Sequence, residues 1–223
     1  MASDYDTALP RTGAFEREQV TTQTLFGHVM GLVAVTTAFA ALGAYIGRDL
    51  NPGAGFGFFI GALGLTFGLR FAIARSERLA VTLLFGMGLL LGLFIGPVVN
   101  YYAQSNPGVV YQSAGATALF VGGLGAYGYA TSRDFSTWAR TLFWSLLALI
   151  VFGVVTIFIA IPGGNVIYAL LGLVLFGFYT IFDFNRLKRA SDIRLAPAIA
   201  ASIFLDLFNV FLFFLSLFGG GRR

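Results

Sequence analysis

The chain contains no cysteine, one histidine and one lysine among its 223 residues. Without cysteine it has no disulfide, thiolate nucleophile or iron–sulfur ligand. The histidine, His28, does not make a transition-metal site by itself, and we expect a packed or interfacial side chain. The lysine, Lys188, lies between two apolar runs, so it does not suit the buried Schiff base of a retinal protein.

Charged residues are also scarce. They make up 11% of the chain, against about 25% in a typical soluble domain. Hydrophobic residues make up 57%, and the mean hydropathy is +0.83. These values predict an all-α integral membrane protein whose main partner is the lipid bilayer. The basic residues gather at the ends of apolar runs, as in membrane proteins, so we expect no nucleic-acid partner.

Apolar runs close to the about 20 residues that cross the hydrocarbon core occur seven times. The predicted spans are 25–47, 54–74, 79–102, 109–130, 140–161, 165–186 and 197–218. We predict one transmembrane domain, 25–218, between a polar N-terminal tail, 1–24, and a short C-terminal tail, 219–223. The N-terminal tail lacks the pattern of a cleaved signal peptide.

The distribution of basic residues predicts how the spans are oriented. With seven spans, eleven of the 14 Lys and Arg fall on the side of the N-terminus and three on the other side. The positive-inside tendency then places the N-terminus in the cytoplasm and the C-terminus outside. Short loops and thirteen arginines to one lysine favour a bacterial plasma (inner) membrane.

Glycine is abundant, with 29 residues, and part of it recurs at four-residue spacing. The repeats are Gly57 with Gly61, Gly64 with Gly68, and Gly88 with Gly92 and Gly96. In lipid, small residues at this spacing let helix backbones approach closely. We interpret these stripes as helix-packing surfaces.

Two aspartates, Asp183 and Asp206, stand inside the sixth and seventh apolar runs. A carboxylate in such a segment costs several kcal/mol unless it is paired, hydrated or protonated. In an antiparallel hairpin centred between residues 194 and 195, the two aspartates lie at equal depth near the cytoplasmic side. The sequence therefore predicts a carboxylate pair on the last two helices.

Two carboxyl groups in a low-dielectric site cannot both ionise cheaply, so the pair tends to share one proton. Rising pH would remove this proton, replace a hydrogen bond by repulsion and loosen the hairpin, which makes the pair a candidate pH sensor and gate. The candidate counter-ions are Arg70, Arg75 and Arg186. Asn209, one turn beyond Asp206, is a candidate cavity-lining residue.

A purely structural explanation remains open for each aspartate. Asp183 can be an interfacial acid that pairs with Arg186, three residues further along the helix. Asp206 lies deeper in apolar sequence and has no such neighbour, so a structural role explains it less well.

The segments around the two aspartates, 177–187 and 201–215, resemble the signature of the transmembrane Bax inhibitor motif family. In that family the sixth span ends in a tyrosine-aspartate motif, and the seventh carries a leucine-aspartate motif followed by asparagine. The resemblance extends from about Thr24 to the end of the chain. Phe182 stands where many members have tyrosine, which removes a hydroxyl group from the site.

The resemblance implies six helices around a central seventh and a pH-sensitive calcium leak, with Ca²⁺ as the transported ion and no cofactor. Asp183 and Asp206 match the proton-sensing pair, and a transient Ca²⁺ position near them follows from the same resemblance. An arginine of the family's second span maps onto Arg75 or Arg70. Calcium selectivity rests on the resemblance alone.

Two other classes of function stay open. An intramembrane aspartyl protease also carries one aspartate on each of two late spans, but it has a Gly-x-Gly-Asp motif, and Asp206 follows Leu205. We therefore expect no enzymatic activity. A non-conducting membrane regulator or adaptor in stress and cell-death control would use the pair as a structural clasp. Calcium flux in liposomes discriminates the leak from the regulator.

Overall fold

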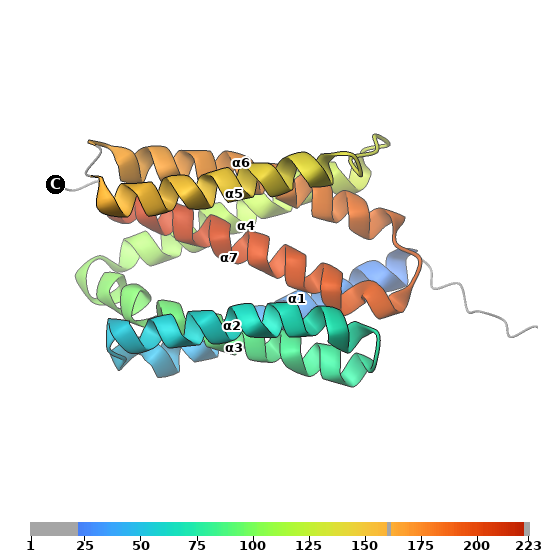
Figure 1. Cartoon of the computed structure of the whole chain (residues 1–223), viewed down its shortest axis with the longest axis horizontal. Coiled ribbons are helices and arrows are strands. Elements are labelled where there is room, and N and C mark those ends of the chain that lie inside the picture. The colour runs from blue at the N-terminus through green and yellow to red at the C-terminus, as the bar shows by residue number, and fades with distance from the viewer. Residues whose placement is uncertain (1–21, 160–161, 221–223) are drawn as a thin grey trace, which may run out of the picture.

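The structure, a computed structural model, describes residues 22–159 and 162–220 and contains seven long helices in that part of the chain (Figure 1). They are α1 (Thr22–Ile46), α2 (Pro52–Ile73), α3 (Glu77–Ser105), α4 (Pro107–Ala130), α5 (Trp138–Phe158), α6 (Gly164–Arg189) and α7 (Ala196–Gly220). Two short 3₁₀ helices, η1 (Gly47–Asp49) and η2 (Ile193–Leu195), lie after α1 and before α7. All seven long helices can cross a membrane by length and composition, which confirms the predicted spans.

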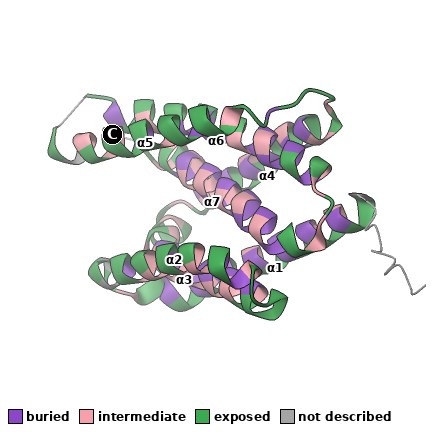
Figure 2. Ribbon diagram, turned by 45° about the vertical axis from the view of Figure 1, so that its right-hand side comes forward, coloured by how far each residue is buried: buried purple, intermediate pink, exposed green. Residues whose placement is uncertain are grey.

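Helix α7 forms the centre of the bundle. It runs obliquely between a group made of α1, α2 and α3 and a group made of α4, α5 and α6 (Figure 1). It contacts α1, α2, α3, α4 and α6, and many of its residues are buried (Figure 2). Helix α5 packs chiefly against α6 at the edge of the bundle. The predicted central seventh helix is therefore confirmed, while the ring around it consists of five helices with α5 outside.

Turn residues begin the helices where the sequence predicts breaks. The Asn51 side chain accepts a hydrogen bond of 3.1 Å from the Gly53 amide at the start of α2. Ser76 caps α3 by accepting a hydrogen bond from the Leu79 amide. Pro107 stands at the first position of α4, where a missing amide hydrogen costs nothing. These local signals set the residue at which each loop ends and the next helix begins, and therefore the depth of each span.

Helix α6 is longer than the sequence predicts. The predicted sixth span ends at residue 186, but α6 continues to Arg189. Lys188 is therefore a helical residue. Three basic residues in the last turn favour this extension, because positive charge stabilises a helix C-terminus.

The ends of the chain also differ from the predicted tails. Helix α1 begins at Thr22, so the last residues of the predicted tail 1–24 are helical, and residues 1–21 lie outside the described part. Helix α7 includes residues 219 and 220, and residues 221–223 lie outside the described part of the chain. Residues 160–161 of the predicted fifth span are also not described.

The glycine stripes have two different environments. Gly88, Gly92 and Gly96 on α3 face the backbone of α1, and a methyl group at any of them would overlap it. Gly57 and Gly64 on α2 have no neighbouring atom where a Cβ would lie. The helix-packing interpretation is therefore confirmed for α3 and wrong for these two positions of α2.

Candidate functional site

The two aspartates meet where α6 packs against α7. The side chains are almost fully buried, with 4% of Asp183 and 3% of Asp206 exposed. Their carboxyl groups lie within hydrogen-bonding reach of each other. The structure thus brings together the two residues that the hairpin places at equal depth.

Among the buried polar side chains of the described core, the two aspartates have the least complete hydrogen bonding. Other buried hydroxyl groups donate to carbonyl oxygens of their own helices; these are Thr36, Ser113, Thr117 and Thr180. Among the described residues, Oδ2 of Asp206 has no hydrogen-bond partner. A buried oxygen without a partner is costly. A proton shared between the carboxyl groups turns one of them into a donor, and this lowers the cost.

Tyr179 is a further member of the site that the sequence interpretation missed. Its phenol group lies close enough to Asp183 and Asp206 for both charges to act on it. It precedes Asp183 by one helical turn, and this spacing places the two residues on the same face of α6. The Tyr179 hydroxyl group makes no hydrogen bond to either carboxyl group in the described structure, so its link to the pair is electrostatic.

The three candidate counter-ions have different positions. Arg186 is exposed, and its charge acts on Asp183 without an ion pair within 4.0 Å. The burial of Asp183 contradicts the interpretation of this residue as an interfacial acid. Arg70 and Arg75 are exposed at the end of α2, and neither acts on the aspartates.

Arg75 lies instead at a separate polar cavity of about 410 Å³. This cavity lies between the α2–α3 turn and the connection from α6 to α7, where Asp192 and Arg194 also line it. Asp192 is already engaged, because it forms an ion pair of 3.1 Å with Arg194. The structure therefore separates Arg75 from the buried carboxyl pair.

Asn209 is committed to its own helix. Its amide nitrogen donates a hydrogen bond of 2.7 Å to the carbonyl oxygen of Leu205 and none to Asp206. No group of three or more metal-binding acids or histidines occurs among the described residues. Ca²⁺ takes about six to eight oxygen ligands. Asp183 and Asp206 alone therefore fit a transient position for Ca²⁺ better than a resident one.

A second buried polar side chain, Asn185, fastens the end of α6 to the loop between α4 and α5. Only 2% of Asn185 is exposed. Its amide nitrogen donates to the carbonyl oxygens of Gly128, at 3.2 Å, and Arg133, at 3.1 Å. Its oxygen accepts hydrogen bonds from the Phe135 amide and from Nε of Arg189. All four bonds that an asparagine amide ordinarily makes are present.

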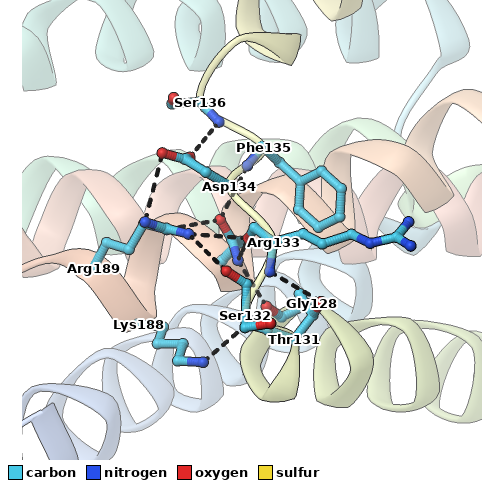
Figure 3. A network of polar contacts seen from close by, with 10 residues as sticks. Gly128, Thr131, Ser132, Arg133, Asp134, Phe135, Ser136, Lys188 and Arg189 are labelled. Carbon is cyan, nitrogen blue, oxygen red and sulfur yellow. Dashed lines mark hydrogen bonds and ion pairs between the residues drawn. The ribbon is translucent and has the colours of Figure 1, made fainter.

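Two basic side chains extend this contact, which we call the α6 clamp (Figure 3). Arg189 donates a hydrogen bond of 3.0 Å to the Arg133 carbonyl and forms an ion pair of 3.5 Å with Asp134. Lys188 donates one of 2.9 Å to the Thr131 carbonyl. Hydrogen bonds from Ser136, and then the charge of Arg189, hold the pKa of Asp134 below its usual value. The sequence interpretation missed this clamp because the bonded residues are 52 to 57 residues apart in the chain.

Comparison with known proteins places the chain in a family. The family model described as inhibitor of apoptosis-promoting Bax1 matches residues 22–223. A membrane protein of Vibrio cholerae is 29% identical over 214 residues, which are 94% of each chain. The inner membrane protein YccA of Escherichia coli O6:H1 is 24% identical over 96% of this chain and 95% of its own. Protein PM0402 of Pasteurella multocida is 34% identical over 57% of this chain and 58% of its own.

The seven spans and these bacterial relatives, one of them an inner membrane protein, identify a multi-pass protein of the bacterial inner membrane. The family match covers every described helix, including the segments with Asp183 and Asp206. The chain therefore belongs to the Bax1-I family, the inhibitors of apoptosis-promoting Bax1.

Proposed function

We propose that the protein is a pH-sensitive calcium leak of the membrane, in which protonation of Asp183 and Asp206 controls the gate. One observation carries the proposal: two carboxyl groups are buried together between α6 and α7, and one of their oxygens has no partner among the described residues. Such a pair is stable with a shared proton and unstable without it.

The gate would work by electrostatic repulsion. With one proton, the carboxyl groups form a hydrogen bond that holds α7 against α6. When rising pH removes this proton, two negative charges face each other. Two unit charges at about 4 Å repel by about 4 kcal/mol at an effective dielectric constant of about 20. This energy is comparable to the few kcal/mol that separate two conformations of a switching protein.

The α6 clamp supports the proposal that α7 is the helix that moves. Asn185, Lys188 and Arg189 tie α6 to the end of α4 and to the α4–α5 loop, close to Asp183. At the start of α7, Asp192 bonds to Arg194 within its own connection. Repulsion at the pair would therefore displace α7 relative to a fixed α6. The ionised pair would also attract a cation to the middle of the bundle, as intramembrane carboxylates do in ion pathways.

Calcium flux in liposomes tests the proposal. The full chain is reconstituted in vesicles that contain a Ca²⁺ indicator, and flux is followed across about pH 6 to 8, where buried carboxyl groups can exchange protons. We expect flux to increase with pH and to lose this dependence in Asp183→Asn and Asp206→Asn. Absence of Ca²⁺ flux at every pH would refute the leak. Flux with the same pH dependence in both variants would refute the gate.

A non-conducting membrane regulator is the second candidate, and the burial of the pair supports it as well. Side chains that are 4% and 3% exposed suit a clasp between two helices. In that case Asp206→Asn would change thermal stability, and wild-type liposomes would pass no Ca²⁺.

We also propose that the protein is not an enzyme. This follows from the absence of glycine before Asp206, where intramembrane aspartyl proteases have a Gly-x-Gly-Asp motif. Incubation with a model transmembrane helix is the test. Cleavage by the wild type that is lost in Asp206→Asn would establish a protease instead.

A further inference from the structure

A groove of about 710 Å³ lies between α1, α3, α4 and α7, and neither Asp183 nor Asp206 lines it. Its size falls in the range of about 300 to 1,000 Å³ that small-molecule sites occupy. Small side chains make the space, including Ala44 on α1 and Ala114 and Ala118 on α4. The two alanines of α4 are exposed, so the groove opens at this helix.

The polar groups of the groove gather at one end. Along α1 and η1 the lining runs from Thr37 to Arg48, about 16 Å at the helical rise of about 1.5 Å per residue. Arg48 and Asn100 lie at the end of this lining, where α1 leaves its span. Near the other end, the hydroxyl groups of Thr37 and Thr117 donate to their own helices. An occupant therefore meets a charge at one end and hydrocarbon along the rest.

The Arg48 side chain is held in place, while some of the N–H donors of its guanidinium group stay free. Its guanidinium carbon lies 4.4 Å from the centre of the Tyr45 ring, and its Nε donates to Asp49 at 3.1 Å. Asn100 donates to the Arg48 carbonyl oxygen and fixes the backbone there. The Tyr45 hydroxyl group also interacts with the guanidinium group, and Asp49 and Tyr45 together leave part of its five N–H donors free. A guanidinium fork with free donors suits a phosphate group.

The position of the groove favours a lipid over water. Polar side chains are few in its lining, and apolar cavities tend to stay dry. The groove covers about half of a hydrocarbon core of about 30 Å and opens on a helix surface that faces the bilayer. An acyl chain of a neighbouring phospholipid has the length, the polarity and the access to fill it.

We propose that this groove binds one acyl chain of an anionic phospholipid, with the lipid phosphate on Arg48. The inner wall is made by Phe204, Leu207 and Phe208, which flank Asp206 on α7. A bound chain would therefore brace α7 on the side of α1, α3 and α4. The site does not depend on the proposed calcium leak, because its residues recognise lipid whether or not the bundle conducts ions.

Photochemical labelling tests the site. The full chain is reconstituted in vesicles with equal parts of phosphatidylglycerol and phosphatidylcholine, and a trace of one of the two lipids carries a diazirine on its acyl chain. Labelled peptides are identified by mass spectrometry. We expect the phosphatidylglycerol probe to label Ala114, Ala118 and Leu207 more than Ile150, an exposed residue of α5. Labelling of the groove by phosphatidylglycerol should exceed labelling by phosphatidylcholine about fivefold, the effect of one basic residue near an anionic lipid.

Two pairs of variants separate the head-group contact from the acyl-chain contact. Arg48→Gln should abolish the fivefold preference, whereas Arg140→Gln, at an exposed arginine of α5, should keep it. Ala118→Phe fills the groove and should reduce its labelling severalfold. Ala126→Phe adds the same bulk at an exposed position of α4 outside the groove and should leave labelling unchanged.

Three results would overturn the proposal. They are even labelling of all lipid-facing helices, a preference for phosphatidylglycerol that survives Arg48→Gln, and occupation of the groove by a second copy, seen as crosslinks between chains. If Ala118→Phe does not fold, Arg48→Gln decides the outcome, because it adds no bulk and leaves the walls intact.

Discussion

Asp183 and Asn185 lie two residues apart on α6, are both buried, and bind in different directions. Asn185 donates to carbonyl oxygens of the last turn of α4 and of the α4–α5 loop, while Asp183 reaches Asp206 on α7. Two residues of a helix differ in direction by about 200°. One side of α6 is therefore anchored, and the opposite side carries the group that can change its charge.

We expect Asp206→Asn to uncouple the bundle from pH. An asparagine amide can donate to ionised Asp183 without a shared proton, so the repulsion at high pH disappears. The variant should melt at a higher temperature than the wild type at about pH 8, where buried carboxyl pairs lose their proton, and the difference should shrink towards about pH 6. Thermal unfolding in detergent measures this. A variant that is less stable than the wild type at both pH values would contradict a shared proton.

Asn185→Ala should destabilise the protein by about 2 to 3 kcal/mol, because it leaves carbonyl oxygens of Gly128 and Arg133 without this donor. Asn209→Ala is the matched control. The Asn209 amide bonds only within its own helix, so this change should cost less than about 1 kcal/mol. Denaturant titration of the purified variants gives both values, and equal losses would argue against the α6 clamp.

Asp134 makes the stability of the protein depend on pH in a different, more acidic range. Its pKa in the folded state is held below the usual value, first by hydrogen bonds from Ser136 and then by Arg189. The contribution of Asp134 to the stability of the fold is therefore present above its pKa in the unfolded chain, about 4, and is lost as pH falls through its pKa in the folded protein. We expect Asp134→Asn to leave any flux response between about pH 6 and 8 unchanged, since Asp134 stays ionised there.

Hydrogen exchange of residues 131–137 checks this directly. Asp134→Asn should increase exchange in this loop at about pH 6, and the wild type should approach the same behaviour only below about pH 4. A wild-type loop that opens between about pH 6 and 8 would instead assign part of the pH response to Asp134.

Close contact of α1 and α3 predicts opposite effects for two glycine substitutions. A Cβ at Gly88 would lie 2.7 Å from the carbonyl oxygen of Thr36, so Gly88→Ala should cost about 1 to 3 kcal/mol. Gly64 faces open space, and Gly64→Ala should be neutral or stabilise by up to about 1 kcal/mol through helix propensity. Melting temperatures compare the two variants, and a stable Gly88→Ala would show that α1 and α3 can separate without loss of the fold.

The sequence predicts the spans well because the bilayer imposes a length and an apolar composition on each of them. It also places Asp183 and Asp206 at equal depth, since a short loop leaves a hairpin little freedom. The sequence does not predict the α6 clamp. Asn185 binds carbonyl oxygens 52 and 57 residues earlier in the chain, and no local pattern reports a bond over that separation. The longer α6 follows from the same contacts.

The sequence by itself determined a seven-span membrane protein with an acidic residue on each of its last two helices, because composition, length and loop spacing are local properties. Tertiary structure decided which groups surround these acids. It placed Tyr179 within electrostatic range of the pair, left Arg70 and Arg75 exposed, and left an oxygen of Asp206 without a partner in the described bundle. These outcomes depend on how α7 packs among five other helices, and packing is set by contacts between residues far apart in the chain.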